Sequence, residues 1–230
     1  ASARYPEAAI ALDDALRVFD RIGAQSMRVQ IRSLVAGVDA KRGDYARALQ
    51  RLSEARSIGG NAMDPGLHAE LLLSEGDVWT ELSDYDRASS LYEAALKLLG
   101  NTPSPTLGHG LASVGWMDHL RGRSEAALER LSAADALHRD AAEPGSRGNV
   151  LRAIGQVQYD LRRLEAAAAS LRAAIALQAD APSEAAHSWL CLAQVERAAG
   201  RADESQAALD AALRLLEGSD ALDLTILADR

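Results

Sequence analysis

The chain of 230 residues has little of what marks several protein classes. Its 1 cysteine, Cys191, excludes an internal disulfide framework and a cysteine-rich metal site. Aromatic residues make up 4% of the sequence, which is unusual for a compact core. No apolar run is long enough to cross a bilayer, and no charged segment followed by an apolar one opens the chain as in a signal peptide. We therefore expect a cytoplasmic protein without a membrane partner.

A basic stripe is also missing. The net charge is −8, with 33 acidic and 25 basic residues, and both signs are mixed along the chain. The densest basic stretch, between Arg152 and Arg172, is interrupted by Asp160 and Glu165. Because phosphate neutralisation supplies much of the affinity for nucleic acid, this pattern predicts no nucleic-acid partner. The preference for arginine over lysine, together with abundant alanine, indicates a GC-rich bacterial source.

Signals for catalysis and metal binding are absent from the sequence pattern. No histidine has another histidine three or four residues away, and no HExxH segment occurs. His109 and His119 are ten residues apart, roughly 15 Å along a helix, which is too far to share a metal. Cys191 lies between apolar residues and is expected to act as a small hydrophobic residue. We predict no catalytic residue, no metal and no cofactor.

What the sequence does contain is an internal repeat. Segments such as Gly43–Ala48, Ser83–Ala88 and Gly122–Ala127 align with one another and recur along the whole chain. The position that follows the turn repeats every 38 to 40 residues, and its members are Tyr5, Tyr45, Tyr85, Ser124, Leu164 and Ala202. A steady period of this size indicates stacked supersecondary units.

Four further repeat positions follow each turn at steps of three or four residues, which places them on one face of a second helix. The small residues of the first position are Ala8, Ala48, Ala88, Ala127, Ala167 and Ser205. The large residues of the next are Leu12, Leu52, Tyr92, Leu131, Leu171 and Leu209. The third position holds Ala15, Ala55, Ala95, Ala134, Ala174 and Ala212. The fourth holds Val18, Ile58, Leu98, Leu137, Leu177 and Leu215.

A first helix precedes each turn. We predict first helices over residues 25–42, 67–82, 107–121, 147–161 and 184–199. Seven residues before the turn residue, each has a small side chain, and these are Ala36, Gly76, Gly115, Gly155 and Ala193. Because glycine in a helix costs roughly 1 kcal/mol against alanine, this pattern predicts close helix contact. Trp79 and Trp189 fall among the large packing positions of these helices.

Each unit is thus a helix, a tight turn, a second helix and a longer loop. A single helix pair cannot bury its apolar face alone, so the units must stack into an all-α solenoid. We expect one solenoid over residues 1–230, whose parts are the second helix of repeat 1 (1–24), five repeats (25–60, 61–101, 102–140, 141–180 and 181–218) and a further helix or cap (219–230). This division suggests a fragment of a larger regulatory or signalling protein.

The small residue of the first helix, the Gly43-Asp44-Tyr45 turn and the Ala, Leu and Ala positions of the second helix resemble tetratricopeptide repeats. The common unit has 34 residues. The longer unit here is more similar to the repeats of MalT-type regulators and kinesin light chains. The resemblance implies a right-handed superhelix and a non-catalytic module whose first helices bind a protein or peptide in a concave groove.

The register separates expected core residues from expected groove residues. The candidate binding patch comprises His109, Trp116, His119, Asn149, Arg152, Gln156 and Tyr159. Aromatic and arginine side chains are frequent interface anchors. The Lys and Asn residues with which related domains bind chaperone C-termini are missing at the matching positions, which are Ser33, Gly37, Ser74, His109 and Ser113.

Two alternatives remain open. A small-ligand sensor arm of a MalT-like regulator would need a closed pocket rather than an open groove. The second alternative is self-association through the terminal repeats, because an uncapped solenoid end exposes apolar surface.

Overall fold

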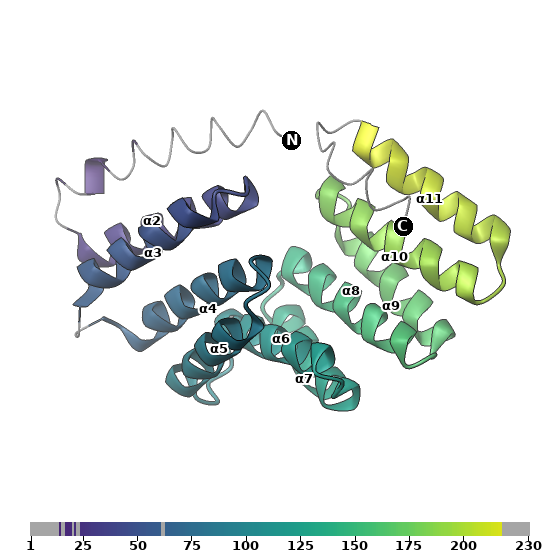
Figure 1. The fold of residues 1–230 in the computed structure, drawn as a ribbon, viewed down its shortest axis with the longest axis horizontal. Helices are drawn as coiled ribbons and strands as arrows, with labels where there is room; N and C mark the ends of the chain where they lie inside the picture. Colours follow the sequence, from purple (N-terminus) through teal and green to yellow (C-terminus); the bar gives the residue numbers. More distant parts are fainter. Residues whose placement is uncertain (1–13, 15–16, 20, 22–23, 61–62, 218–230) are drawn as a thin grey trace. The chain divides into compact units, whose positions relative to one another are not determined.

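A computed structural model describes residues 14, 17–19, 21, 24–60 and 63–217 (Figure 1). These residues form ten α-helices and no strand. Their bounds are α2 (Gln25–Lys41), α3 (Tyr45–Gly59), α4 (Pro65–Glu81), α5 (Tyr85–Leu99), α6 (Pro105–Leu120), α7 (Ser124–Asp140), α8 (Pro144–Asp160), α9 (Leu164–Leu177), α10 (Pro182–Ala198) and α11 (Ala202–Glu217). The element expected over 219–230, and most of the helix expected within 1–24, lie outside the described residues.

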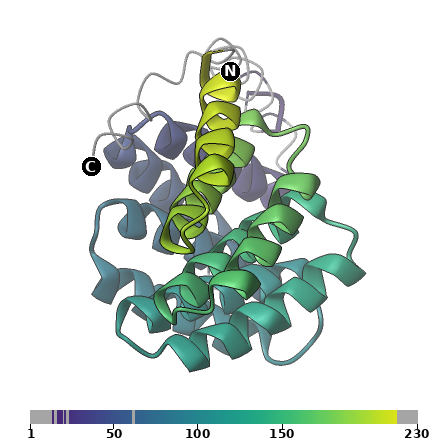
Figure 2. The same cartoon turned by 90° about the vertical axis from the view of Figure 1, so that its right-hand side faces the viewer.

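The helices form consecutive hairpins, with α2 packed on α3, α4 on α5, α6 on α7, α8 on α9 and α10 on α11. They divide into an N-terminal unit, α2–α5, and a C-terminal unit, α6–α11. In the N-terminal unit, α4 contacts both α2 and α3. In the C-terminal unit, α8 contacts α6, α7 and α10, and α11 lies against α10 (Figure 2). The all-α solenoid architecture of antiparallel helix pairs is confirmed.

Except for α2, which begins at Gln25 as expected, the first helices begin earlier than the sequence pattern predicts. α4 and α6 start at Pro65 and Pro105, two residues before the predicted starts, and α8 starts at Pro144, three residues before. Proline fits the first turn of a helix because its missing N–H has no intrahelical acceptor there. Asp64 and Ser104 cap α4 and α6 by accepting hydrogen bonds from backbone N–H groups.

The tight turns place one residue in the left-handed backbone region. Glycine occupies this position at Gly43, Gly122 and Gly200, with φ between 77° and 79°. Ser83 and Arg162 occupy it with φ of 59° and 60°. A side chain is disfavoured in this region because Cβ approaches the following carbonyl oxygen. These two turns are therefore strained relative to the glycine turns.

Two of the small second-helix positions are buried as predicted. Ala48, Ala88, Ala127 and Ala167 have no solvent exposure, and neither have Ala55, Ala95, Ala134, Ala174 and Ala212. The fourth position differs from the prediction, because Leu98 is 39% exposed. The buried residue lies one place later, where His138 and Gln178 are found. A step of four residues from the alanine, rather than three, returns to the same helix face.

The glycines of the first helices make the close contacts that their position predicts. A Cβ atom added to Gly155 would lie 2.7 Å from Cγ of Leu171, and one added to Gly76 would clash with the ring of Tyr92. The two buried polar side chains pack in the same manner. Nε2 of His138 would lie 2.9 Å from a Cβ atom on Gly108. Glycine at these positions therefore allows the two helices of a hairpin to approach.

A buried carboxylate lies near the end of three of the five described first helices, four residues before the turn glycine. Arg51 Nε donates a hydrogen bond of 2.7 Å to Asp39 Oδ2. Arg130 binds Asp118 in the same way. In both pairs the arginine lies twelve residues after the aspartate in the chain. Each pair joins the first helix of a hairpin to the second helix. The buried charge is thus neutralised by a cation at close range.

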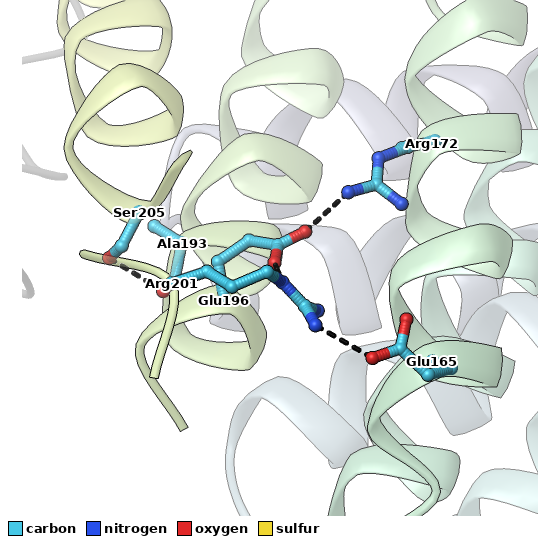
Figure 3. Close-up of polar contacts among 6 residues, drawn as sticks. All are labelled: Glu165, Arg172, Ala193, Glu196, Arg201 and Ser205. Carbon is cyan, nitrogen blue, oxygen red and sulfur yellow. Dashed lines mark hydrogen bonds and ion pairs between the residues drawn. The ribbon is translucent and has the colours of Figure 1, made fainter. Parts of the chain in front are cut away.

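The third buried carboxylate, Glu196, joins successive hairpins (Figure 3). Its side chain accepts a hydrogen bond from Arg172 on α9 and another from Arg201 in the turn after α10. Arg201 also donates to Glu165 at the start of α9. Hydrogen bonds to the two carboxylates raise the pKa of Arg201. The network fixes α9 against α10, and a second pair, Arg163 with Glu125, likewise joins successive second helices across one repeat.

Candidate functional site

The seven candidate residues all lie on two neighbouring helices of the C-terminal unit, α6 and α8, and α8 in turn contacts α10. On α8 they are spaced three, four and three residues apart, which places them on one helix face. His187 and Cys191 on α10 lie beside this face. We call the whole set the first-helix face, and its members are His109, Trp116, His119, Asn149, Arg152, Gln156, Tyr159, His187 and Cys191.

On α6, Trp116 and His119 form an aromatic contact. Their ring centroids are 5.2 Å apart and the planes are tilted by 46°. Trp116 is half-buried and packs against the buried cluster that includes Leu131 and Ile154. One edge of its ring system is therefore supported by the core while part of the side chain stays accessible.

His119 is bound on both sides of its ring. Nδ1 lies 3.0 Å from Ser124 Oγ, and Nε2 lies 3.0 Å from Asp160 Oδ2. These contacts connect α6 with the start of α7 and the end of α8. His119 thus contributes to the face mainly by orienting Trp116 and by holding the ends of the helices together. His109, half-buried near the start of α6, also has an internal interaction.

Asn149 at the start of α8 belongs to a polar chain that crosses three helices. Gln178 Nε2 donates to Asn149 Oδ1 at 3.0 Å, and Ser188 Oγ donates to Gln178 Oε1 at 2.7 Å. Gln178 and Ser188 are buried. The chain joins α8, the end of α9 and α10. Asn149 is itself exposed, and its side-chain oxygen accepts the hydrogen bond from Gln178.

Further along α8, Arg152 and Gln156 face α10. Gln156 forms a hydrogen bond with the Cys191 thiol, and the charge of Arg152 acts on both Cys191 and His187. All four side chains are half-buried. Arg152 Nε is buried and has no hydrogen-bond partner in the described part of the chain.

The surroundings shift two pKa values in this group. Burial lowers the pKa of His187 from 6.5, the positive charge of Arg152 lowers it further, and Glu184 opposes both. Burial raises the pKa of the Cys191 thiol, with Arg152 and Gln156 acting in the opposite direction. At neutral pH this group of four side chains therefore presents a neutral imidazole, a thiol, an amide and a guanidinium.

Tyr159 and Trp189 are half-buried and pack against one buried cluster, which includes Leu171 and Leu192. Trp79 in the N-terminal unit is half-buried and carries the Arg87 guanidinium 4.4 Å above its ring. Tyr159, like Trp116, exposes only part of its side chain. The two tryptophans expected in the core are packed but not fully buried.

His187 and Cys191 are the residues of this face that the sequence prediction leaves out. The repeat period contains the signal, because His187 aligns with His109 and Asn149 at intervals of 40 and 38 residues. Cys191 aligns with Ser113 in the same way. Their position beside Arg152 could have been inferred from the register, but their contacts depend on how α8 packs on α10.

The described residues contain no group of three or more His, Cys, Asp or Glu side chains that could hold a metal ion. None of the described helices combines the length and apolar character needed to cross a membrane.

No protein-family model matches the sequence, and no curated protein matches it. Among solved structures, BtubC (BKLC) from P. vanneervenii is 18% identical, with a TM-score of 0.70 over 95% of this chain and 92% of that chain. A Rap protein complexed with competence and sporulation factor is 15% identical, with a TM-score of 0.72 over 88% of this chain and 58% of that chain. A Podosopora anserina putative kinesin light chain with nearly identical TPR-like repeats is 16% identical, with a TM-score of 0.61 over 85% of this chain and 97% of that chain.

At sequence identities of 15% to 18%, the similarity to these solved structures shows a shared fold. The more specific resemblance to MalT-type regulators stays a prediction. The chain shares the architecture of these solved structures, as its helix hairpins, turn geometry and buried alanine positions indicate. The chain therefore has the fold of the tetratricopeptide-like repeat proteins.

Proposed function

We propose that the chain is a non-catalytic interaction module that binds an extended peptide, or an extended segment of a partner protein, on the first-helix face of the C-terminal unit. The observation that carries this proposal is the continuity of partly exposed polar and aromatic side chains across three neighbouring helices. Trp116 lies on α6, Gln156 on α8 and Cys191 on α10. Repeat folds present such continuous surfaces to partners.

The composition of the face suits a protein ligand. Interfaces are enriched in aromatic and arginine side chains, and the energetically important contacts involve groups that are already partly buried. Trp116 and Tyr159 are held against the core, so binding orders few new side-chain rotamers. Gln156 adds amide hydrogen-bonding groups that can pair with a peptide backbone.

A solved structure with a similar fold supports this proposal. The similar Rap protein was solved in a complex with competence and sporulation factor. By extension, we propose that this chain serves a regulatory or signalling protein in the bacterial cytoplasm. Self-association through terminal repeats remains a separate prediction, which concentration-dependent light scattering on the full chain would test.

The test begins with selection of random peptides displayed on phage against the full chain. Selected peptides are synthesised, and their Kd values are measured by fluorescence anisotropy. Gln156→Glu introduces a negative charge at the centre of the face with little change in side-chain volume, and Gln206→Glu makes the same charge change at an exposed position on α11. We expect the Gln156 variant to weaken binding about tenfold and the Gln206 variant to leave it unchanged, since interface energy concentrates in few residues.

Two results would contradict the proposal. Either no peptide binds the full chain, or both variants weaken binding equally. A small molecule that stabilises the protein in a thermal-shift screen while no peptide binds would instead favour a small-ligand sensor arm.

A further inference from the structure

Arg152 differs from the other half-buried arginines of the C-terminal unit. Arg130 binds Asp118, Arg147 lies 2.7 Å from Asp135, and Arg201 binds Glu196. Within the described residues Arg152 has no ion pair with a carboxylate, and its buried Nε atom has no hydrogen-bond acceptor. A buried, unsatisfied donor costs free energy that an incoming acceptor would recover.

The neighbours of Arg152 do not neutralise it. Gln156 lies one turn along α8 and carries no charge, and the Cys191 thiol stays protonated because burial raises its pKa. His187 is neutral at neutral pH, since burial and Arg152 lower its pKa. Glu184, on the same helix as His187, acts on that imidazole but forms no ion pair with Arg152. The positive charge of Arg152 is therefore not neutralised by these neighbours, and a negatively charged ligand group would neutralise it.

We propose that Arg152, assisted by Gln156, anchors a carboxylate of the bound peptide, so that the module selects extended segments with an acidic side chain at this position. This inference rests on the proposed function and names its ligand chemistry. A guanidinium presents parallel N–H groups that match a carboxylate in a bidentate pair. The Gln156 amide can donate a further hydrogen bond to the same oxygens or to the adjoining peptide backbone.

A peptide fits this anchor better than a free organic acid. The face continues from Arg152 toward Trp116 on the adjacent first helix, α6. A carboxylate attached to a peptide gains contacts with these side chains, whereas a free acid gains only the ion pair. Partly exposed ion pairs alone contribute little affinity.

The experiment uses the full chain, immobilised, and two matched pools of short peptides. One pool has Glu at its centre and the other has Gln, and the flanking positions are random and uncharged. We expect about tenfold more of the Glu pool to be retained, as a charge-assisted bidentate pair exceeds a neutral hydrogen bond. Arg152→Gln should abolish this preference, so that the variant retains the two pools equally. Arg152→Lys should keep part of it.

Arg214→Gln is the matched control, because Arg214 is exposed on α11 and the substitution removes the same charge. It should leave the preference for the Glu pool intact. Circular dichroism and thermal melting of each variant confirm that folding is unaffected. Retention of the Glu pool should also fall as salt is added, because the ion pair is screened.

The possible failures are distinguishable. If neither pool is retained, the proposed function itself is contradicted. If the wild-type chain retains both pools equally, or if the Arg152 variant keeps the preference, only the carboxylate anchor is overturned. If free succinate displaces the Glu pool at comparable concentration, the anchor recognises small acids rather than peptides.

Discussion

The Glu196 side chain on α10 lies 2.5 Å from Nη2 of Arg172 on α9, which ties two successive hairpins together through a carboxylate that is 1% exposed (Figure 3). A buried charge is stable only when its partners stay in place. The network is therefore a point where stability depends on specific residues rather than on apolar area alone.

Removing this carboxylate should be costly. We expect Glu196→Ala to lower the free energy of unfolding by about 2 kcal/mol or more, since it removes hydrogen bonds that two arginines donate to a buried carboxylate. Glu165 belongs to the same network but is 81% exposed. Glu165→Ala should change stability by less than about 1 kcal/mol. Urea denaturation of both variants measures the difference, and equal losses would show that burial is not what gives Glu196 its importance.

The strained turns offer a stabilising substitution. Arg162 and Ser83 occupy the left-handed region that glycine fills in the other three described turns between paired helices. Replacing either by glycine should raise the free energy of unfolding by about 0.5–1 kcal/mol, because the Cβ penalty exceeds the added entropy of the unfolded chain. The reverse change, Gly122→Ala, should destabilise. Thermal melts test both directions, and a loss of stability in Arg162→Gly would contradict the account of these turns.

Two glycines on α8 should respond in opposite ways to the same substitution. Gly155→Ala places a Cβ atom 2.7 Å from Leu171 and should destabilise by about 1 kcal/mol or more, despite the better helix propensity of alanine. Gly145 has open space around the same position. Gly145→Ala should be neutral or should stabilise by up to about 1 kcal/mol. If both variants gain stability in urea denaturation, the inference that α8 and α9 pack closely at Gly155 is contradicted.

The pKa of His187 depends on the positive charge of Arg152. The pKa of His187 is lowered in the folded protein, so the unfolded chain binds the proton more readily. This histidine therefore contributes stability fully above pH 6.5 and less as the pH falls below that value. NMR titration should show the pKa of His187 rising in Arg152→Gln. An unchanged titration would place the guanidinium too far away to act on the imidazole.

The repeat period was sufficient to predict the hairpins, because each position of the repeat has a simple requirement for size or apolar character. Ala48 and Ala55 are buried where the spacing places them. The helix starts were less accurate, since apolar periodicity begins only at Leu67 and Leu107, after the proline and the cap. The sequence contained those signals in Pro65 and Pro105.

The buried polar residues were harder to predict. Gln158 and Ser170 occupy the same repeat positions as Asp118 and Arg130, and Ser170 donates to Gln158 at 2.9 Å. Considered alone, each of these polar residues would be predicted to be exposed to solvent. Only the fixed interval of twelve residues between compatible partners shows that the two side chains meet across the hairpin.

The sequence predicted which candidate residues share a helix face but not the contacts that they make. Periodicity identifies which residues share a helix face, so Arg152 and Gln156 were found together. It does not show what neighbouring hairpins supply. The contacts of His119 with Asp160, and of Asn149 with Gln178, arise from packing between helices.

The central claim, that a peptide binds the first-helix face, is tested most directly at Cys191, the single cysteine of the chain. The rate of Cys191 alkylation is measured with and without a saturating selected peptide. A second variant, Cys191→Ser with Glu129→Cys, moves the thiol to exposed α7 as a control. The account predicts that the peptide slows alkylation of Cys191 about tenfold or more, as expected when a tightly bound ligand covers the site, and leaves the control rate unchanged. Unchanged alkylation of Cys191 by a chain saturated with peptide would contradict it.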